Sequence, residues 1–193
     1  MIARTLSQIS AGFNAVERLL LKLLMAAIAI FVLMNVLLRM IGITVAWADE
    51  ISVYTMVMSG FVGASLMLRA RVDPAVLLLR EILPERTHHI LRATVSAISA
   101  AFGIILCYLC WRWFNPSALI EAKFNIAQFE GSTFNFIYTD VTPVMGLPAF
   151  FFYLVVPFFA IAITIHALTN LCEDLGLIER PSDPAGISGG EAQ

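Results

Sequence analysis

The sequence predicts an all-α membrane protein with four transmembrane helices, and three observations support that prediction. First, 60% of the 193 residues are hydrophobic and 13% are charged, whereas soluble domains average about 45–50% and about 25%. Second, the chain contains four apolar runs of the length that crosses a bilayer, which takes about 20 helical residues. Third, Lys and Arg are concentrated in alternate connecting segments, as the positive-inside rule expects.

The chain begins with an amphipathic stretch that precedes the first span. Apolar residues recur there at three- and four-residue spacing, at Leu6, Ile9, Phe13, Val16 and Leu20. This period predicts a helix over 4–18, and we expect residues 1–18 to lie in the membrane interface or against a partner. The first span, 19–38, contains one charge, Lys22, whose long side chain can reach the headgroups.

Three further spans complete the predicted transmembrane domain, 19–172, and are placed at 51–68, 93–111 and 144–172. The second span contains no charged residue, Arg112 marks the end of the third, and the fourth is uncharged unless His166 is protonated. Pro157 lies inside the fourth span. It predicts a kink there, because proline lacks an N–H and frees a carbonyl one turn earlier.

The segments between the spans set the expected orientation. Nine of the twelve Lys and Arg residues fall in the N-terminal arm, the segment after the second span and the tail, so both termini are predicted to be cytoplasmic. After the second span, Asp73 and Pro74 open a short helix that Pro84 ends. Residues 173–193 are polar and rich in Gly and Pro, which predicts a disordered cytoplasmic tail.

The stretch V-A-W-A-D-E-I at 45–51 interrupts the apolar sequence and has three interpretations. Cleavage by a signal peptidase after Ala48 would remove far more than the usual 15–30 or so residues, which excludes that interpretation. As a helix start, Asp49 and Glu50 would favour the positive end of the dipole and cap free N–H groups. Trp47 would then sit in the aromatic belt at the membrane surface.

The third interpretation is a polar seam across the first hairpin. Arg39 ends the first span at the same surface as the two carboxylates, and Asn35 lies four residues earlier on the same helical face. Asn35, Arg39, Asp49 and Glu50 could therefore set the geometry of the hairpin or form part of a docking surface.

Other residue patterns are best explained by helix packing. Small residues four apart allow close approach of membrane helices; the pairs are Ser59 with Gly63, Gly60 with Ala64, and Ser99 with Gly103. Cys107 and Cys110 have the spacing of a redox motif but lie in an apolar span, so we interpret them as core residues. His166 is the one histidine inside a span, which excludes a bis-histidine haem but leaves a single axial ligand open.

The sequence offers no support for catalysis or nucleic-acid binding. Patterns such as H-E-x-x-H, G-x-S-x-G and the Walker motif do not occur, so we expect no enzyme activity, catalytic residue, metal or cofactor. The net charge is -2, without a basic patch interleaved with aromatic residues, so nucleic acid is not an expected partner.

Several short motifs together resemble one transporter family. The first span ends in L-L-R, W-A-D-E follows, the second span ends in S-L-M-L-R-A-R, and the fourth contains M-G-L-P-A-F-F-F-Y-L-V-V-P. Over roughly 15–170 the chain is similar to the small membrane subunit, of DctQ type, of the tripartite ATP-independent periplasmic (TRAP) transporters. That family has four membrane helices with both ends inside the cell, which agrees with the topology predicted from charge.

The resemblance implies an accessory role in a bacterial inner membrane. TRAP systems import carboxylates and related organic anions on a sodium gradient, and a periplasmic binding protein delivers the substrate to a large multi-span subunit. The small subunit braces this separate large chain within the bilayer, and the sodium and substrate sites belong to the large chain. The family motifs correspond here to Arg39, Trp47, Asp49 and Glu50, and to Tyr153 and Pro157 in the last helix.

Two departures from the family pattern and two alternative functions stay open at this point. The family commonly has a Gly-x-His segment after the second span, where this chain reads R-A-R-V-D-P. The loop 115–143 is long and aromatic, and the alternation Phe134, Phe136, Tyr138 suggests an extended stretch or a set of interfacial anchors. The alternatives are a membrane anchor for a haem- or quinone-linked redox enzyme, and the small subunit of another tripartite importer.

Overall fold

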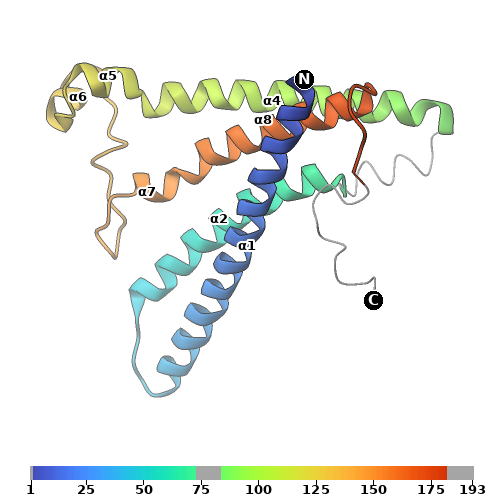
Figure 1. Cartoon of the computed structure of the whole chain (residues 1–193). Coiled ribbons are helices and arrows are strands. Elements are labelled where there is room, and N and C mark those ends of the chain that lie inside the picture. Colours follow the sequence, from blue (N-terminus) through green and yellow to red (C-terminus); the bar gives the residue numbers. More distant parts are fainter. Residues whose placement is uncertain (1, 73–83, 182–193) are drawn as a thin grey trace.

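The computed structural model describes residues 2–72 and 84–181, and these residues form an all-α protein (Figure 1). Four helical stretches are long and apolar enough to cross a membrane, which confirms the predicted fold class. The helices are α1 (Ile2–Met40), α2 (Ala46–Ala70), α4 (Glu85–Phe114), α5 (Pro116–Glu121), α6 (Ile126–Thr133), α7 (Phe150–Tyr153) and α8 (Val155–Asp174).

Helix α8 lies at the centre of the arrangement. It packs along α4 and also contacts α2 and α1, while α1 and α2 form an antiparallel hairpin that diverges from the α4–α8 pair (Figure 1). In its most apolar stretch 39% of the residues of α8 are buried, against 11% for α1. The hairpin therefore leaves most of its apolar surface uncovered by the described part of this chain.

Helix α1 runs without interruption through the boundary predicted at residue 18. Its 39 residues extend about 58 Å at 1.5 Å per residue, well beyond the roughly 30 Å hydrocarbon core. The face that α1 buries within the bundle includes polar residues that the sequence analysis did not single out. Ser10, Asn14 and Glu17 are buried, whereas Ile9 and Val16 of the apolar stripe are about half exposed. The polar face is packed inside, Phe13 and Leu20 of the apolar stripe pack partly against the bundle, and the rest of the apolar stripe is left for lipid or a partner.

The other spans also differ from their predicted ends. Helix α2 begins at Ala46 and α4 at Glu85, both earlier than expected, because polar residues at a membrane surface continue a helix readily. The fourth span begins at Phe150 rather than 144, because Gly146 has a positive φ of 64° and Pro148 forms a bridge with Val141. The short helix predicted after Asp73 and the tail beyond residue 181 lie outside the described residues.

Pro157 accompanies a break in the fourth span, as predicted. A turn at Leu154 separates α7 from α8, and Pro157 is the third residue of α8. Because Pro157 has no N–H, it provides no hydrogen-bond donor to the carbonyl of Tyr153 one turn earlier. The fourth span is consequently interrupted near the end where the aromatic loop packs.

The predicted extended stretch in the aromatic loop is wrong. The loop forms the short helices α5 and α6, and Phe134 ends α6 in the left-handed conformation with φ 53°, which interrupts any strand. Phe129 is fully buried, and its ring meets that of Tyr138, which also meets Phe114 and Phe150. The Tyr138 hydroxyl donates to the Phe114 carbonyl at 2.7 Å, and burial raises the pKa of Tyr138.

Candidate functional site

Asn35, Arg39 and Asp49 meet at the end of the first hairpin that the turn between α1 and α2 closes. Arg39 lies in the last turn of α1 and Asp49 in the first turn of α2; their Nη2 and Oδ2 atoms are 3.5 Å apart. Asn35 donates through Nδ2 to the other carboxylate oxygen of Asp49. The Arg39 and Asp49 side chains are 64% and 58% exposed, so their pairing stabilises the hairpin by less than about 1 kcal/mol. Both charges remain accessible to a partner.

Glu50 does not join this seam and does not cap its own helix. The N-terminus of α2 has no side-chain cap. Instead the Glu50 carboxylate accepts hydrogen bonds from the backbone N–H groups of Val144, at 3.1 Å, and Met145, at 2.7 Å. It thereby ties the start of α2 to the loop that enters the fourth span. Trp47 is 46% exposed and meets Phe31 edge to face.

The opposite end of the bundle, which the charge distribution predicts to face the cytoplasm, holds a buried ionic network, here called the inner-end network, that joins α2 to α8. Arg69 donates to Glu173 at 2.8 Å and to Asn170 at 2.5 Å, and Arg71 donates to Glu173 at 3.1 Å and to Asp174 at 2.6 Å. The Arg69 and Glu173 side chains are 2% and 0% exposed. Glu173 and Asp174, expected in the tail, are therefore structural residues of α8.

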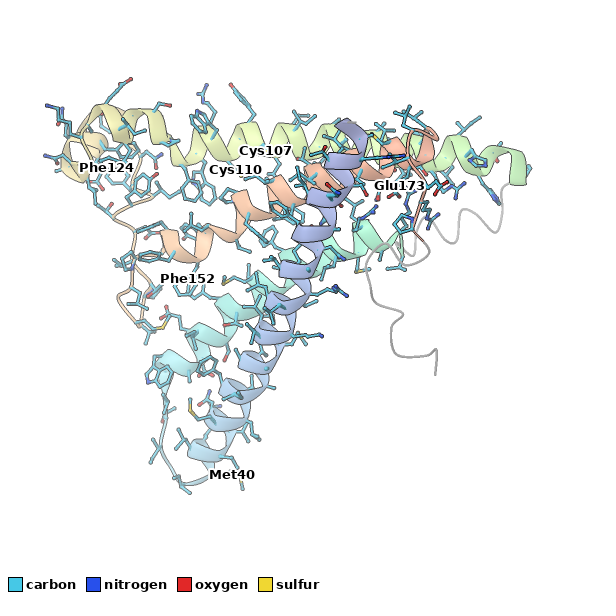
Figure 2. The ribbon with its side chains drawn as sticks, viewed as in Figure 1. Met40, Cys107, Cys110, Phe124, Phe152 and Glu173 are labelled. Atoms are coloured by element: carbon cyan, nitrogen blue, oxygen red, sulfur yellow. The ribbon has the colours of Figure 1, made fainter. Side chains whose placement is uncertain are left out.

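Figure 2 shows the separation of the two ends: Glu173 lies near one end of α8, and Phe124 and Phe152 lie toward the other end of the bundle. Ser96 of α4 also donates to Asp174 at 2.8 Å. The inner-end network therefore connects three spans. The Glu173 side chain is fully buried and is shared by two arginines, so loss of either arginine would leave Glu173 and Asp174 with one cation in place of two.

A second buried polar group fixes the N-terminal half of α1 to α8. The Ser10 hydroxyl lies 2.7 Å from Nδ1 of His166, and Nε2 of His166 lies 2.9 Å from a carboxylate oxygen of Glu17. All three residues are fully buried. Serine, histidine and an acid also form catalytic triads, but here a substrate has no access to the hydroxyl.

The sequence analysis missed this group, although a signal was present. Ser10, Asn14 and Glu17 are spaced four and three residues apart, so they form a polar stripe with the same helical period as the apolar stripe beside it. Both ring nitrogens of His166 already have partners, which leaves neither for an axial haem bond.

Among the glycines of the described residues, Gly103 allows two helices to approach closely. A Cβ atom at Gly103 would lie 3.0 Å from the Cα of Thr164 on α8. Around Gly60 and Gly63 there is nothing within 4 Å, and the Ser59 hydroxyl donates to Met56 in its own helix. The α2 glycines therefore lie on an uncovered face.

The other predicted groups have structural surroundings. Cys107 and Cys110 are free thiols, and the Cys107 sulfur lies 3.7 Å from the Thr164 hydroxyl. Among the described residues, no group of three or more His, Cys, Asp or Glu side chains is placed to hold a metal ion. Tyr153 donates to Asp140 at 3.2 Å and packs against Trp113.

Comparison with known families gives a match that runs from within α1 to just beyond α8. Residues 28–177 match the family described as tripartite ATP-independent periplasmic transporters, DctQ component. The chain belongs to the DctQ family. Comparisons with curated proteins and with solved structures give no match.

Membership makes the chain a small membrane subunit of a TRAP transporter, and it removes the two alternative functions. DctQ is a family of transporter subunits rather than of redox anchors, and the tripartite system is the TRAP type. The matched range includes Asn35, Arg39 and Asp49 of the hairpin seam and all residues of the inner-end network. Ser10 and Glu17 lie before it, so their pairing with His166 is a feature of this DctQ chain that the family match does not cover.

Proposed function

We propose that this DctQ protein is the accessory subunit of a sodium-coupled TRAP importer of carboxylates or related organic anions in a bacterial inner membrane. Both termini would be cytoplasmic, since the positive-inside rule favours that orientation. The family match carries the proposal, because it assigns the chain to the DctQ component. The transported ion and the substrate would bind the large membrane subunit, which is a separate chain.

The mechanism we propose for this subunit is static bracing. The described spans are fastened to one another at both ends: by Glu50 and the 144–145 backbone at one, and by Arg69 and Glu173 at the other. Fastened helices move together, so the subunit can act as a rigid body against a moving partner. The uncovered apolar faces of α1 and α2, which include Leu33 and Val53, supply the surface on which a large membrane subunit could pack.

We further propose that the outer end of the hairpin takes part in docking the periplasmic binding protein. Arg39, Trp47 and Asp49 are all substantially exposed. Exposed charges of this kind steer association and fix orientation more than they add affinity. Arg39 and Asp49 would then serve both the hairpin and the partner.

Reconstitution tests the accessory role directly. The large membrane subunit is incorporated into proteoliposomes with or without this chain, the binding protein is added, and uptake of a labelled carboxylate is followed with and without a sodium gradient. The proposal predicts gradient-dependent uptake when both membrane chains are present and a loss of most uptake when this chain is omitted. Equal uptake without this chain would refute the bracing role, and uptake independent of sodium would refute the coupling.

A further inference from the structure

An aromatic and acidic recess lies at the outer end of the bundle, apart from the hairpin. It has a volume of about 410 Å³, and its lining includes Trp113, Phe136, Asp140 and Tyr153. The rings of Trp113 and Tyr153 are 5.4 Å apart at an interplanar angle of 35°. Trp113 is 41% and Phe136 is 59% exposed, so aromatic surface faces the opening.

Hydrogen bonds hold the lining in place. Asn135 donates through Nδ2 to the Trp113 carbonyl at 2.7 Å, which fastens the loop to the last turn of α4. The Tyr153 hydroxyl donates to Oδ2 of Asp140 at 3.2 Å, and the Asp140 carbonyl accepts from the Ala149 N–H at 2.9 Å. The carboxylate is thus oriented beside the rings before any ligand arrives, which lowers the entropic cost of binding.

The charge of the surrounding outer segments favours a cation. These segments contain three basic residues, Arg39, Arg112 and Lys123, and five acidic ones, Asp49, Glu50, Glu121, Glu130 and Asp140. Ring faces carry negative potential and attract ammonium and guanidinium groups, most strongly at tryptophan. A carboxylate next to two such faces therefore selects a cation and repels an anionic transport substrate.

We infer that this recess receives a lysine or arginine side chain of the soluble binding protein. The inference rests on the proposed function and its orientation, which place the recess on the periplasmic side. Trp113 lies in the last turn of α4 and Asp140 lies in the loop beyond that helix, so the lining extends past the end of the span. A protein side chain arriving from water fits that position better than a lipid headgroup does.

The first test measures affinity between the intact transporter, in lipid nanodiscs, and its binding protein at physiological salt. Asp140→Asn removes the carboxylate charge, and Trp113→Leu removes the ring that attracts cations more strongly than Tyr153 does. We expect each to raise Kd about threefold to tenfold. Glu121→Gln is the matched control, because it removes an exposed charge from the same outer loop without touching the recess, and its Kd should stay within about twofold.

A second measurement identifies the occupant. A photo-crosslinking amino acid replaces Phe136 in the full transporter, and mass spectrometry locates the adduct. The inference predicts a peptide of the binding protein that contains Lys or Arg at the crosslinked surface. An adduct with phosphatidylethanolamine or with the large subunit would overturn it.

The outcomes separate this inference from the proposed function. If the wild-type transporter binds the binding protein but Asp140→Asn and Glu121→Gln have equal effects, the recess is not the contact and the accessory role stands. If the wild-type transporter does not bind the binding protein, the docking proposal fails and the inference fails with it. Unchanged co-purification of the large subunit with each variant excludes a folding defect.

Discussion

Replacing Gly103 by alanine perturbs a close contact between α4 and α8. The added Cβ would overlap the Thr164 hydroxyl and lie 3.0 Å from the Thr164 Cα and 3.1 Å from its nitrogen. That hydroxyl is not free to move, because it donates to the Ala160 carbonyl at 2.6 Å. Two of the three close atoms are backbone, so α4 and α8 would have to separate.

The expected change in the unfolding free energy of Gly103→Ala is the sum of two opposing effects. Overpacking of a close-packed site costs about 1–3 kcal/mol, and the better helix propensity of alanine offsets up to about 1 kcal/mol of this. We therefore expect a net loss of about 1–2 kcal/mol. Gly60→Ala is the matched control, since nothing lies within 4 Å of a Cβ at Gly60. Only the helix propensity changes there, which predicts an increase in the unfolding free energy of up to about 1 kcal/mol.

The assay is reversible denaturant unfolding of the purified chain in mild detergent, followed by circular dichroism. The two alanine variants should differ by about 2 kcal/mol in unfolding free energy, with Gly103→Ala the less stable. Equal stability of Gly103→Ala and Gly60→Ala would refute the close approach of α4 and α8 at Gly103.

Three further predictions concern the polar contacts. Arg69→Met should lower the unfolding free energy by about 1–3 kcal/mol, because it leaves buried acceptor atoms of Glu173 and Asn170 without their donor while Arg71 still pairs with Glu173, whereas Arg39→Met should cost less than about 1 kcal/mol. The same unfolding assay checks both, and similar losses would contradict the burial argument. Glu50→Gln should speed hydrogen exchange at the two amides it binds by about tenfold or more, measured by mass spectrometry, while Asp49→Asn should leave those amides unchanged. The purified chain should show no haem absorbance after incubation with haemin, because both ring nitrogens of His166 are occupied; a band that disappears in His166→Ala would refute this.

The four spans could be predicted from the sequence because they depend on a local quantity, the length of an apolar run. The approach of Arg39 to the two carboxylates at 49–50 could also be predicted, since a short turn joins their helices, but the choice of Asp49 over Glu50 could not. The break in the helix near Pro157 could be predicted as well, because a missing N–H disrupts a helix whatever packs around it. These features need no knowledge of how distant segments pack.

The features that were missed depend on distant partners. Glu50 binds amides 94 and 95 residues further along the chain, and a helix-start interpretation accounts for the same residue equally well. The N-terminal half of α1 has an apolar stripe and a polar stripe of the same period, so period alone does not decide which is buried. His166 on α8 decides it, because it offers Ser10 and Glu17 hydrogen-bond partners inside the bundle.

The most direct test of the accessory role is purification of this chain from its native membrane in mild detergent, followed by native mass spectrometry. The account predicts a complex with a large multi-span membrane subunit in equal amount. Recovery of the chain by itself, or with a soluble flavin or iron–sulfur protein in place of that subunit, would contradict it.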